Sequence, residues 1–321
     1  MRVALLILGV SALALTVAWA TAPREDWPGA LPPPEPGADL DAWLAAREGV
    51  FDDLTSGTEK AIIWAGEPGA QTDLAVVYIH GFSASRQEIA PVPERIAQAL
   101  GANFFATRLA GHGRDGQALA GARLDDWALD VAEAIAIGQR LGQRIVLMGT
   151  STGGSLATLA TLEPAWRGDI EALITVSPNF ALNSRQVRAL DLPWARAWLP
   201  LIAGGERSWA PFSEGHARYW TLSYPMQALF SLRAAQRAAA AADHGAARVP
   251  MLVFYAPRDE VVVPAATARV IERWGARADA HVITDAEDPN QHVITGAIRA
   301  PSTSDFVVET SLDWLADLPG R

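Results

Sequence analysis

A serine flanked by two glycines directly follows a short apolar run, Ile-Val-Leu-Met, at residues 145–148. The pentapeptide at 149–153 is Gly-Thr-Ser-Thr-Gly and has the form Gly-x-Ser-x-Gly. The apolar run reads as a buried strand, and residues 155–162 read as a helix that Pro164 stops. So sharp a turn from strand to helix strains the backbone at the serine and needs glycines where the two elements approach. The motif therefore predicts that Ser151 is a nucleophile presented at the end of a strand.

Apolar runs and helical patterns alternate along the rest of the chain. Strands are expected at residues 60–64, 73–79, 103–109, 144–148, 170–176, 249–255 and 280–284. Helices are expected at 40–47, 86–100, 125–137, 155–162, 264–274 and 305–315, with Pro91 and Pro93 disturbing the first half of the stretch at 86–100. This alternation predicts an α/β fold, with a mostly parallel central sheet and helices on both faces.

One long connection interrupts the alternation. The strand ending near Ser177 and the strand starting at Val249 are about 70 residues apart, whereas ordinary connections rarely exceed 12–15 residues. The stretch is rich in aromatic residues and contains an alanine-rich helix pattern at 226–242. We expect residues 180–248 to form a helical cap insertion, because loops at the carboxyl ends of such strands surround the ligand site. An insertion packed away from the site is the alternative.

The N-terminus reads as a targeting segment. Residues 3–20 are almost uninterruptedly apolar and end in the small-x-small pattern Ala18-Trp19-Ala20. The segment 1–20 is predicted to be a signal peptide cleaved after Ala20, or an uncleaved membrane anchor. Residues 21–40 read as a proline-rich linker, which leaves 41–321 as the folded domain. In either case we expect export, to the periplasm, the medium or a membrane surface.

Composition excludes several classes of function. A formal net charge of −10 argues against a nucleic-acid partner, and a chain without cysteine has no disulfide or thiolate metal site. The sequence has no His-Glu-x-x-His pattern or acidic metal loop. The Gly-x-Gly-x-x-Gly pattern at 111–116 resembles a dinucleotide site, but Gly121 is expected to delay the helix that such a site requires. No cofactor and no metal are therefore expected.

A serine hydroxyl needs a general base, and the base needs a carboxylate that orients it. Where the nucleophile occupies this kind of turn, the order along the chain is serine, acid, histidine. His292 lies in the loop after the last predicted strand and is the candidate base. Asp259 follows the strand at 249–255 and is the candidate acid, with Asp285 and Asp288 as alternatives.

The charge that develops on a carbonyl oxygen needs two backbone N–H donors. Thr152, the residue after the nucleophile, is predicted to give one donor. Phe82, in the loop after the strand at 73–79, is predicted to give the other, since Gly81 permits close approach. His80 precedes the serine and ends a buried strand, so we expect a structural role for it.

Together these motifs resemble α/β-hydrolases of the monoacylglycerol lipase and carboxylesterase branch, which is also grouped with the serine aminopeptidases. The resemblance covers roughly residues 55–320 and rests on residues 80–82, 111–113, the turn at Ser151, residues 258–262 and His292. It implies a catalytic triad of Ser151, Asp259 and His292, with the oxyanion held by Phe82 and Thr152.

The resemblance further implies a lipase-like serine esterase that works through an acyl-enzyme. An aromatic cap and an acidic surface favour a small-molecule ester that is neutral and apolar. A peptidase or amidase and an acyltransferase of the same fold remain open, and a non-catalytic binding module is the alternative from another class.

Overall fold

The computed structural model describes residue 13 and residues 16–319. Most of the predicted signal peptide or anchor, residues 1–20, therefore lies outside the described residues. Among the residues that are described, none of the helices combines the length and the apolar character needed to cross a membrane.

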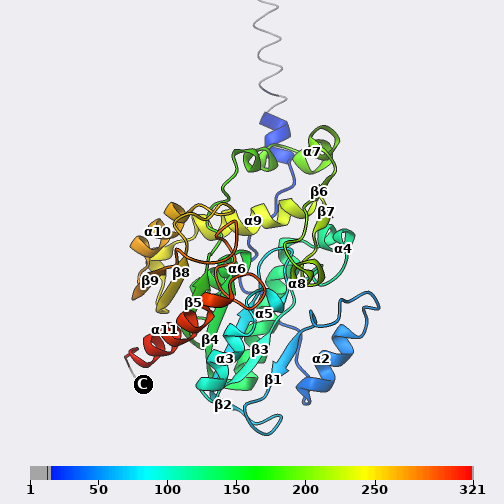
Figure 1. The fold of residues 1–321 in the computed structure, drawn as a ribbon. Coiled ribbons are helices and arrows are strands. Elements are labelled where there is room, and N and C mark those ends of the chain that lie inside the picture. The colour runs from blue at the N-terminus through cyan, green and yellow to red at the C-terminus, as the bar shows by residue number, and fades with distance from the viewer. Residues whose placement is uncertain (1–12, 14–15, 320–321) are drawn as a thin grey trace, which may run out of the picture.

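A seven-stranded sheet forms the centre of the molecule (Figure 1). Its strands, in spatial order, are β1 (Ala61–Ile63), β3 (Asn103–Ala106), β2 (Thr72–Ile79), β4 (Gly142–Thr150), β5 (Ile170–Val176), β8 (Met251–Tyr255) and β9 (Ala278–Val282). Strand β1 runs antiparallel to β3, and every other neighbouring pair is parallel. The predicted α/β class with a mostly parallel sheet is confirmed.

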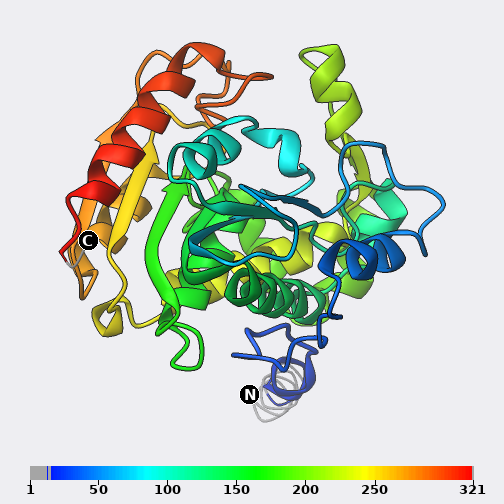
Figure 2. The same cartoon turned by 90° about the horizontal axis from the view of Figure 1, so that it is seen from below.

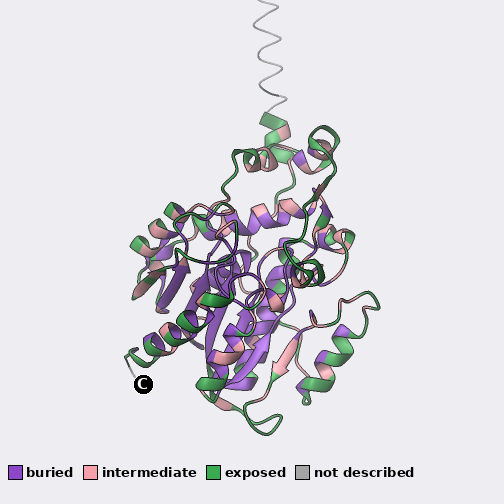
Figure 3. Cartoon of the chain, in the orientation of Figure 1, coloured by how far each residue is buried: buried purple, intermediate pink, exposed green. Residues whose placement is uncertain are grey.

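Helices cover both faces of the sheet (Figure 2). Helices α3 (Val92–Ala99) and α11 (Ser304–Ala316) pack on one face, and α5 (Leu124–Leu141), α6 (Thr152–Leu162) and α10 (Pro264–Arg273) pack on the other. Successive side chains of a strand point to opposite faces. In β2, Val77 and Ile79 accordingly join the α5 side of the core, whereas Val76 and Tyr78 join the α3 side. Both faces are buried (Figure 3), which explains the unbroken apolar runs that mark these strands in the sequence.

Residues 180–248, here called the cap segment, connect β5 to β8 and lie above the sheet in Figure 1. The cap segment contains α7 (Ala195–Ala203), β6 (Glu206–Ser208), α8 (Glu214–Tyr219), β7 (Ser223–Pro225) and α9 (Ala228–Ala241). Strands β6 and β7 pair as a small antiparallel ribbon. Several side chains of the cap segment line the same cavity as Ser151, which follows the carboxyl end of β4.

The proline-rich segment that precedes the domain has no regular secondary structure over residues 23–39, yet it is docked on the domain. The Glu25 carboxylate accepts hydrogen bonds from the Leu124 backbone N–H (3.0 Å) and the Ser231 hydroxyl (2.8 Å). It also pairs with Arg196 of α7. One buried carboxylate therefore joins the segment to α5, α7 and α9.

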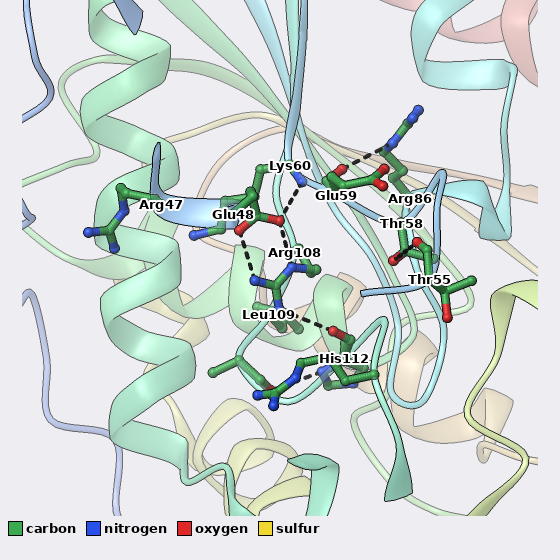
Figure 4. Close-up of polar contacts among 12 residues, drawn as sticks. Arg47, Glu48, Thr55, Thr58, Glu59, Lys60, Arg86, Arg108, Leu109 and His112 are labelled. Carbon is green, nitrogen blue, oxygen red and sulfur yellow. Dashed lines mark hydrogen bonds and ion pairs between the residues drawn. The ribbon is translucent and has the colours of Figure 1, made fainter. Parts of the chain in front are cut away.

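Buried charges join α2 (Leu40–Glu48) to the loop after β3 (Figure 4). The Glu48 carboxylate accepts from Arg108 Nε (2.7 Å) and Nη2 (2.8 Å) and from the Lys60 backbone N–H (3.0 Å). Arg108 also donates from Nη1 to the carbonyl of His112 (3.1 Å). Burial raises the pKa of Glu48, but the bonds and charges of Arg108 and Lys60 outweigh it and lower the pKa below 4.5. The network fixes the loop that carries His112.

Glu48→Gln should lower the free energy of unfolding by about 3 kcal/mol, because it leaves the Arg108 charge buried without a counter-charge. Urea unfolding followed by tryptophan fluorescence measures the change. Asp305→Asn is the control. The Asp305 carboxylate is 76% exposed, and the substitution removes its ion pair with Arg95. That exposed pair should contribute less than about 1 kcal/mol. Equal losses in the two variants would contradict a stabilising role for the buried network.

Candidate active site

The turn at Ser151 is closely packed. Ser151 has φ 51° and ψ −116°, a conformation that residues with a side chain rarely adopt. A Cβ at Gly153 would lie 2.1 Å from the carbonyl oxygen of Ile79 and 2.4 Å from that of His80. A Cβ at Gly149 would lie 2.5 Å from the carbonyl oxygen of Gly153. Gly153 is therefore needed for α6 to start against the end of β2. Gly149 is needed for the end of β4 to lie close to the first turn of α6.

The three residues predicted to form a triad lie together. His292 Nε2 is 3.0 Å from Ser151 Oγ, and His292 Nδ1 is 2.8 Å from Asp259 Oδ2. The second oxygen of Asp259 accepts from the backbone N–H groups of Val261 and Val262, both at 2.8 Å. A carboxylate facing Nδ1 keeps the proton on that nitrogen, so Nε2 is left to accept from the serine hydroxyl.

The charges around His292 favour its protonated form. Burial alone lowers the pKa of His292, but the hydrogen bond and the charge of Asp259 act in the opposite direction. The carboxylates of Glu88 and Asp288 add to the effect of Asp259, and the pKa ends above its ordinary value of 6.5. The site therefore stabilises the imidazolium that proton transfer from serine would create.

The two alternative acids, Asp285 and Asp288, do not face the imidazole nitrogen that Asp259 faces. Asp285 is exposed and makes no recorded hydrogen bond to the imidazole. Asp288 is buried and accepts from the backbone N–H groups of His292 (3.0 Å) and Val293 (2.7 Å). Asp288 also pairs with Arg299, whose guanidinium lies 3.8 Å from the ring centroid of Phe212 in the cap segment. Asp288 thus holds the backbone of the loop that carries His292.

The sequence predicts that the backbone amides of Phe82 and Thr152 are the two oxyanion donors. Both residues line the same cavity as Ser151 and His292. Among the described residues, neither amide has a recorded protein acceptor, and Thr152 is the first residue of α6, where helical N–H groups are unpaired. These amides are free to bind a negatively charged oxygen.

His80 and His112 join neighbouring loops. His80 Nε2 accepts from the Leu109 backbone N–H (3.1 Å), and its Nδ1 lies 2.8 Å from the carbonyl of Gly81. Burial lowers the pKa of His80 to about 4, so the ring is neutral. The His112 ring packs edge-on against that of His80, with centroids 4.9 Å apart. The structure therefore places His80 between the loops after β2 and β3.

The expectation about the glycine pattern at 111–116 was wrong in one respect. Helix α4 (Gly116–Gly121) begins at the last glycine of the pattern, with the Asp115 side chain accepting from Ala118 N–H at 2.8 Å. The close approach that Gly116 allows is to the cap segment, because its Cβ would lie 2.2 Å from the carbonyl oxygen of Ser223 in β7. The glycine is needed for packing against protein.

A cavity of about 1020 Å³ opens above Ser151 and His292. Its wall is largely apolar, and the main apolar contributors from the cap segment are Leu199, Trp209, Phe212, Tyr224, Met226 and Leu229. Across residues 16–319, no cluster of three or more histidine and carboxylate side chains is arranged to hold a metal ion. The arrangement suits an apolar ligand whose reactive group meets a serine.

Known proteins resemble this chain in part of its sequence and in its fold. Residues 70–211 match the sequence model of the serine aminopeptidase family S33. No curated protein matches the chain. A solved structure reported with the metagenome-derived lipolytic enzymes LipS and LipT superposes with a TM-score of 0.68 at 19% identity, over 83% of this chain and 100% of that one.

Two further solved structures have the same fold. A soluble variant of monoglyceride lipase from Saccharomyces cerevisiae, in complex with a substrate analog, gives a TM-score of 0.57 at 14% identity, over 81% of this chain and 92% of that one. Est1E from Butyrivibrio proteoclasticus, with ferulic acid bound, gives a TM-score of 0.55 at 16% identity, over 83% of this chain and 98% of that one. The predicted α/β-hydrolase fold is confirmed.

The imidazole of His292 should titrate above pH 6.5, because Asp259 and the neighbouring carboxylates stabilise its charged form. Asp259→Asn removes the largest of these charges and should lower the pKa of His292. Nitrogen-15 NMR titration of the histidine side chains measures both values, with His80 as the internal reference at a pKa of about 4. A His292 that titrates well below 6.5 in the wild-type protein would contradict the electrostatic description.

Proposed function

We propose that this protein is a serine esterase that hydrolyses neutral, apolar carboxylic esters through an acyl-enzyme. One observation carries the proposal. Ser151, His292 and Asp259 form an unbroken hydrogen-bonded chain at the floor of an apolar cavity, beside two unpaired backbone amides.

In the first half of the reaction, His292 Nε2 takes the proton of the Ser151 hydroxyl while Oγ attacks the ester carbonyl carbon. The N–H groups of Phe82 and Thr152 bind the oxygen as it becomes negatively charged. Asp259 holds the imidazole in the correct tautomer and stabilises its positive charge. His292 then gives the proton to the leaving alcohol, and the acyl group remains on Ser151.

In the second half, water takes the place of the alcohol. His292 removes a proton from this water as its oxygen attacks the acyl carbon, and the same two amides hold the second oxyanion. The proton returns to Ser151 Oγ when the bond to the acyl group breaks. The carboxylic acid leaves, and no cofactor takes part in any step.

The cavity supports a substrate with a sizeable apolar part. Its volume of about 1020 Å³ is at the upper end of the usual range for small-molecule sites, roughly 300–1,000 Å³. Related folds hold a monoglyceride lipase substrate analog and ferulic acid, which are a lipid-like and an aromatic ligand. We therefore favour acyl or aryl esters over highly charged ones.

Amide hydrolysis is the second candidate, and the match to the serine aminopeptidase family favours it. The same triad can attack an amide, since the acylation chemistry is shared. Turnover of aminoacyl arylamides faster than that of matched esters would favour the peptidase. An acyltransferase would instead pass the acyl group to an added alcohol in preference to water. A non-catalytic binding module is the least favoured candidate, because the hydrogen-bonded chain is complete.

Hydrolysis of a p-nitrophenyl ester series, from short to long acyl chains, should be detectable with the wild-type protein and should fall by roughly 10⁴-fold or more in Ser151→Ala. Ser311→Ala is the matched control. That buried serine lies in α11, on the opposite face of the sheet from α6, and donates to the carbonyl of Val307 (2.7 Å). It should keep most of the activity. Ester turnover by Ser151→Ala at the wild-type rate would end the proposal.

We also propose that the enzyme is exported and, if residues 1–20 are not cleaved, held at a membrane by them. The chain that follows residues 1–20 contacts the cap segment, since Glu25 pairs with Arg196 of α7. The exposed apolar side chains Leu201 (84%) and Ile202 (74%) also lie on α7 and favour an apolar surface as neighbour.

Fractionation of cells that express the full chain should find the protein outside the cytoplasm, either in the membrane fraction or with a new N-terminus at Thr21. A chain that starts at residue 21 should stay in the cytoplasm. Recovery of the full, uncleaved chain from the cytoplasm would contradict this location.

A further inference from the structure

A buried carboxyl group that takes no part in the triad lies beside the reacting groups. Glu88 ends the short 3₁₀ turn Arg86–Glu88, is 3% exposed and lines the cavity that Ser151 and His292 line. Its Oε2 atom accepts a hydrogen bond from the Gly81 backbone N–H at 2.7 Å. A Cβ at Gly81 would lie 2.7 Å from Glu88 Oε1, so a side chain at that position would have to displace the carboxyl group.

The same carboxyl group is connected through Tyr78 to β4, the strand that precedes Ser151. Tyr78 Oη, fully buried at the end of β2, lies 3.3 Å from Glu88 Oε2 and 3.0 Å from Thr150 Oγ1. Thr150 is the last residue of β4 and directly precedes Ser151. A continuous series of hydrogen-bonding groups therefore runs from the Gly81 peptide to the residue before the nucleophile.

The two ends of this series are the two segments that carry the oxyanion donors. Gly81 directly precedes Phe82, and Thr150 is two residues before Thr152. Building on the proposed function, we propose that Glu88 and Tyr78 are positioning residues that hold the two oxyanion-hole segments at a fixed separation and orientation.

The physical reason is preorganisation. A backbone amide stabilises an oxyanion only when it already points at the place where the charge develops, and small displacements forfeit much of the effect. Glu88 accepts from the Gly81 N–H, so the peptide between His80 and Gly81 cannot rotate freely. The next peptide along the chain carries the N–H of Phe82. Tyr78 then ties Glu88 to the other donor segment through side chains that are almost entirely out of solvent, where hydrogen bonds are strong.

Glu88 also acts on the base through its charge. Burial raises the pKa of Glu88 to about 7, against the opposing effects of the Gly81 N–H, His292 and Tyr78. The titratable groups that face it are His292 and Tyr78, and its ionised form raises the pKa of His292. Removing this charge should lower the pKa of His292 and move the acid limb of the kcat/KM profile to lower pH.

Three variants and one control test the proposal on the p-nitrophenyl ester that the wild-type protein turns over best. Glu88→Leu removes the acceptor for Gly81 N–H and should lower kcat by roughly tenfold or more, with KM changed by less than about twofold. Glu88→Gln keeps an acceptor oxygen without the charge, so it should restore most of kcat while the acid limb stays at lower pH. Tyr78→Phe breaks the connection to Thr150 and should lower kcat severalfold.

Glu94→Gln is the matched control, because Glu94 is a nearby carboxyl group in α3 whose pKa burial also raises, but it makes no contact with Gly81. It should leave kcat and the acid limb unchanged. A role confined to stability would change the melting temperature of the Glu88 variants without the recovery of kcat in Glu88→Gln and without the shift of the acid limb.

Wild-type kcat in Glu88→Leu would overturn the proposal, and so would a Glu88→Gln enzyme as slow as Glu88→Leu. If Glu88→Leu does not fold, Tyr78→Phe decides, and an unchanged kcat in that variant overturns the proposal. Loss of turnover in Ser151→Ala tests the proposed function separately. If the wild-type protein hydrolyses no ester, the rate at which a fluorophosphonate labels Ser151 replaces kcat, and equal rates in all variants overturn the positioning role.

Discussion

The close approach of α6 to the end of β2 is the constraint on which the rest of the site depends. It is possible only because Gly153 has no side chain, since any Cβ there would collide with the carbonyl groups of Ile79 and His80. This approach strains Ser151 into a rare backbone conformation and places it in the wall of the cavity. It also sets the first amide of α6 near the loop after β2. One packing contact thus fixes the backbone of Ser151, the predicted nucleophile, and the first amide of α6, a predicted oxyanion donor.

The order of the parallel strands brings Asp259 and His292 to the same edge of the sheet as Ser151. Strands β4, β5 and β8 are neighbours in the sheet, so the loops that follow them open at the same edge. Asp259 comes after β8 and His292 comes after β9, the next strand outward. Two backbone N–H groups hold Asp259, and Asp288 holds the backbone of the histidine loop. These hydrogen bonds hold the loops that carry Asp259 and His292.

Much of the architecture could be predicted from the sequence, because buried parallel strands leave long apolar runs and glycines mark the turn. The strand expected at 170–176 is β5 (Ile170–Val176), and the helix expected at 125–137 is contained in α5 (Leu124–Leu141). The stretch 86–100, expected to be helical with a disturbed first half, is a separate 3₁₀ turn followed by α3, which begins at Val92. The prolines at 91 and 93 explain the break.

The groups that escaped prediction act through contacts between distant or non-periodic positions. Glu88 meets Gly81 across a loop and not along one helix or strand, so no periodic pattern in the sequence marks its place beside Ser151. Helix α4 forms despite two glycines because it packs against β7, and tertiary contact overrides weak propensity there. Glu25 lies in a proline-rich stretch that composition alone describes as a linker, yet its partners are 99 and 206 residues away.

The most direct test of the central claim is a crystal structure of the protein after reaction with an alkyl fluorophosphonate, which mimics the tetrahedral intermediate. The geometry predicts a covalent bond from phosphorus to Ser151 Oγ, with the phosphonyl oxygen about 3 Å from the N–H groups of both Phe82 and Thr152. The alkyl chain should extend into the cavity under the cap segment. An adduct on another residue, or an oxygen turned away from these two amides, would contradict the assignment of the turn at Ser151 as the catalytic centre.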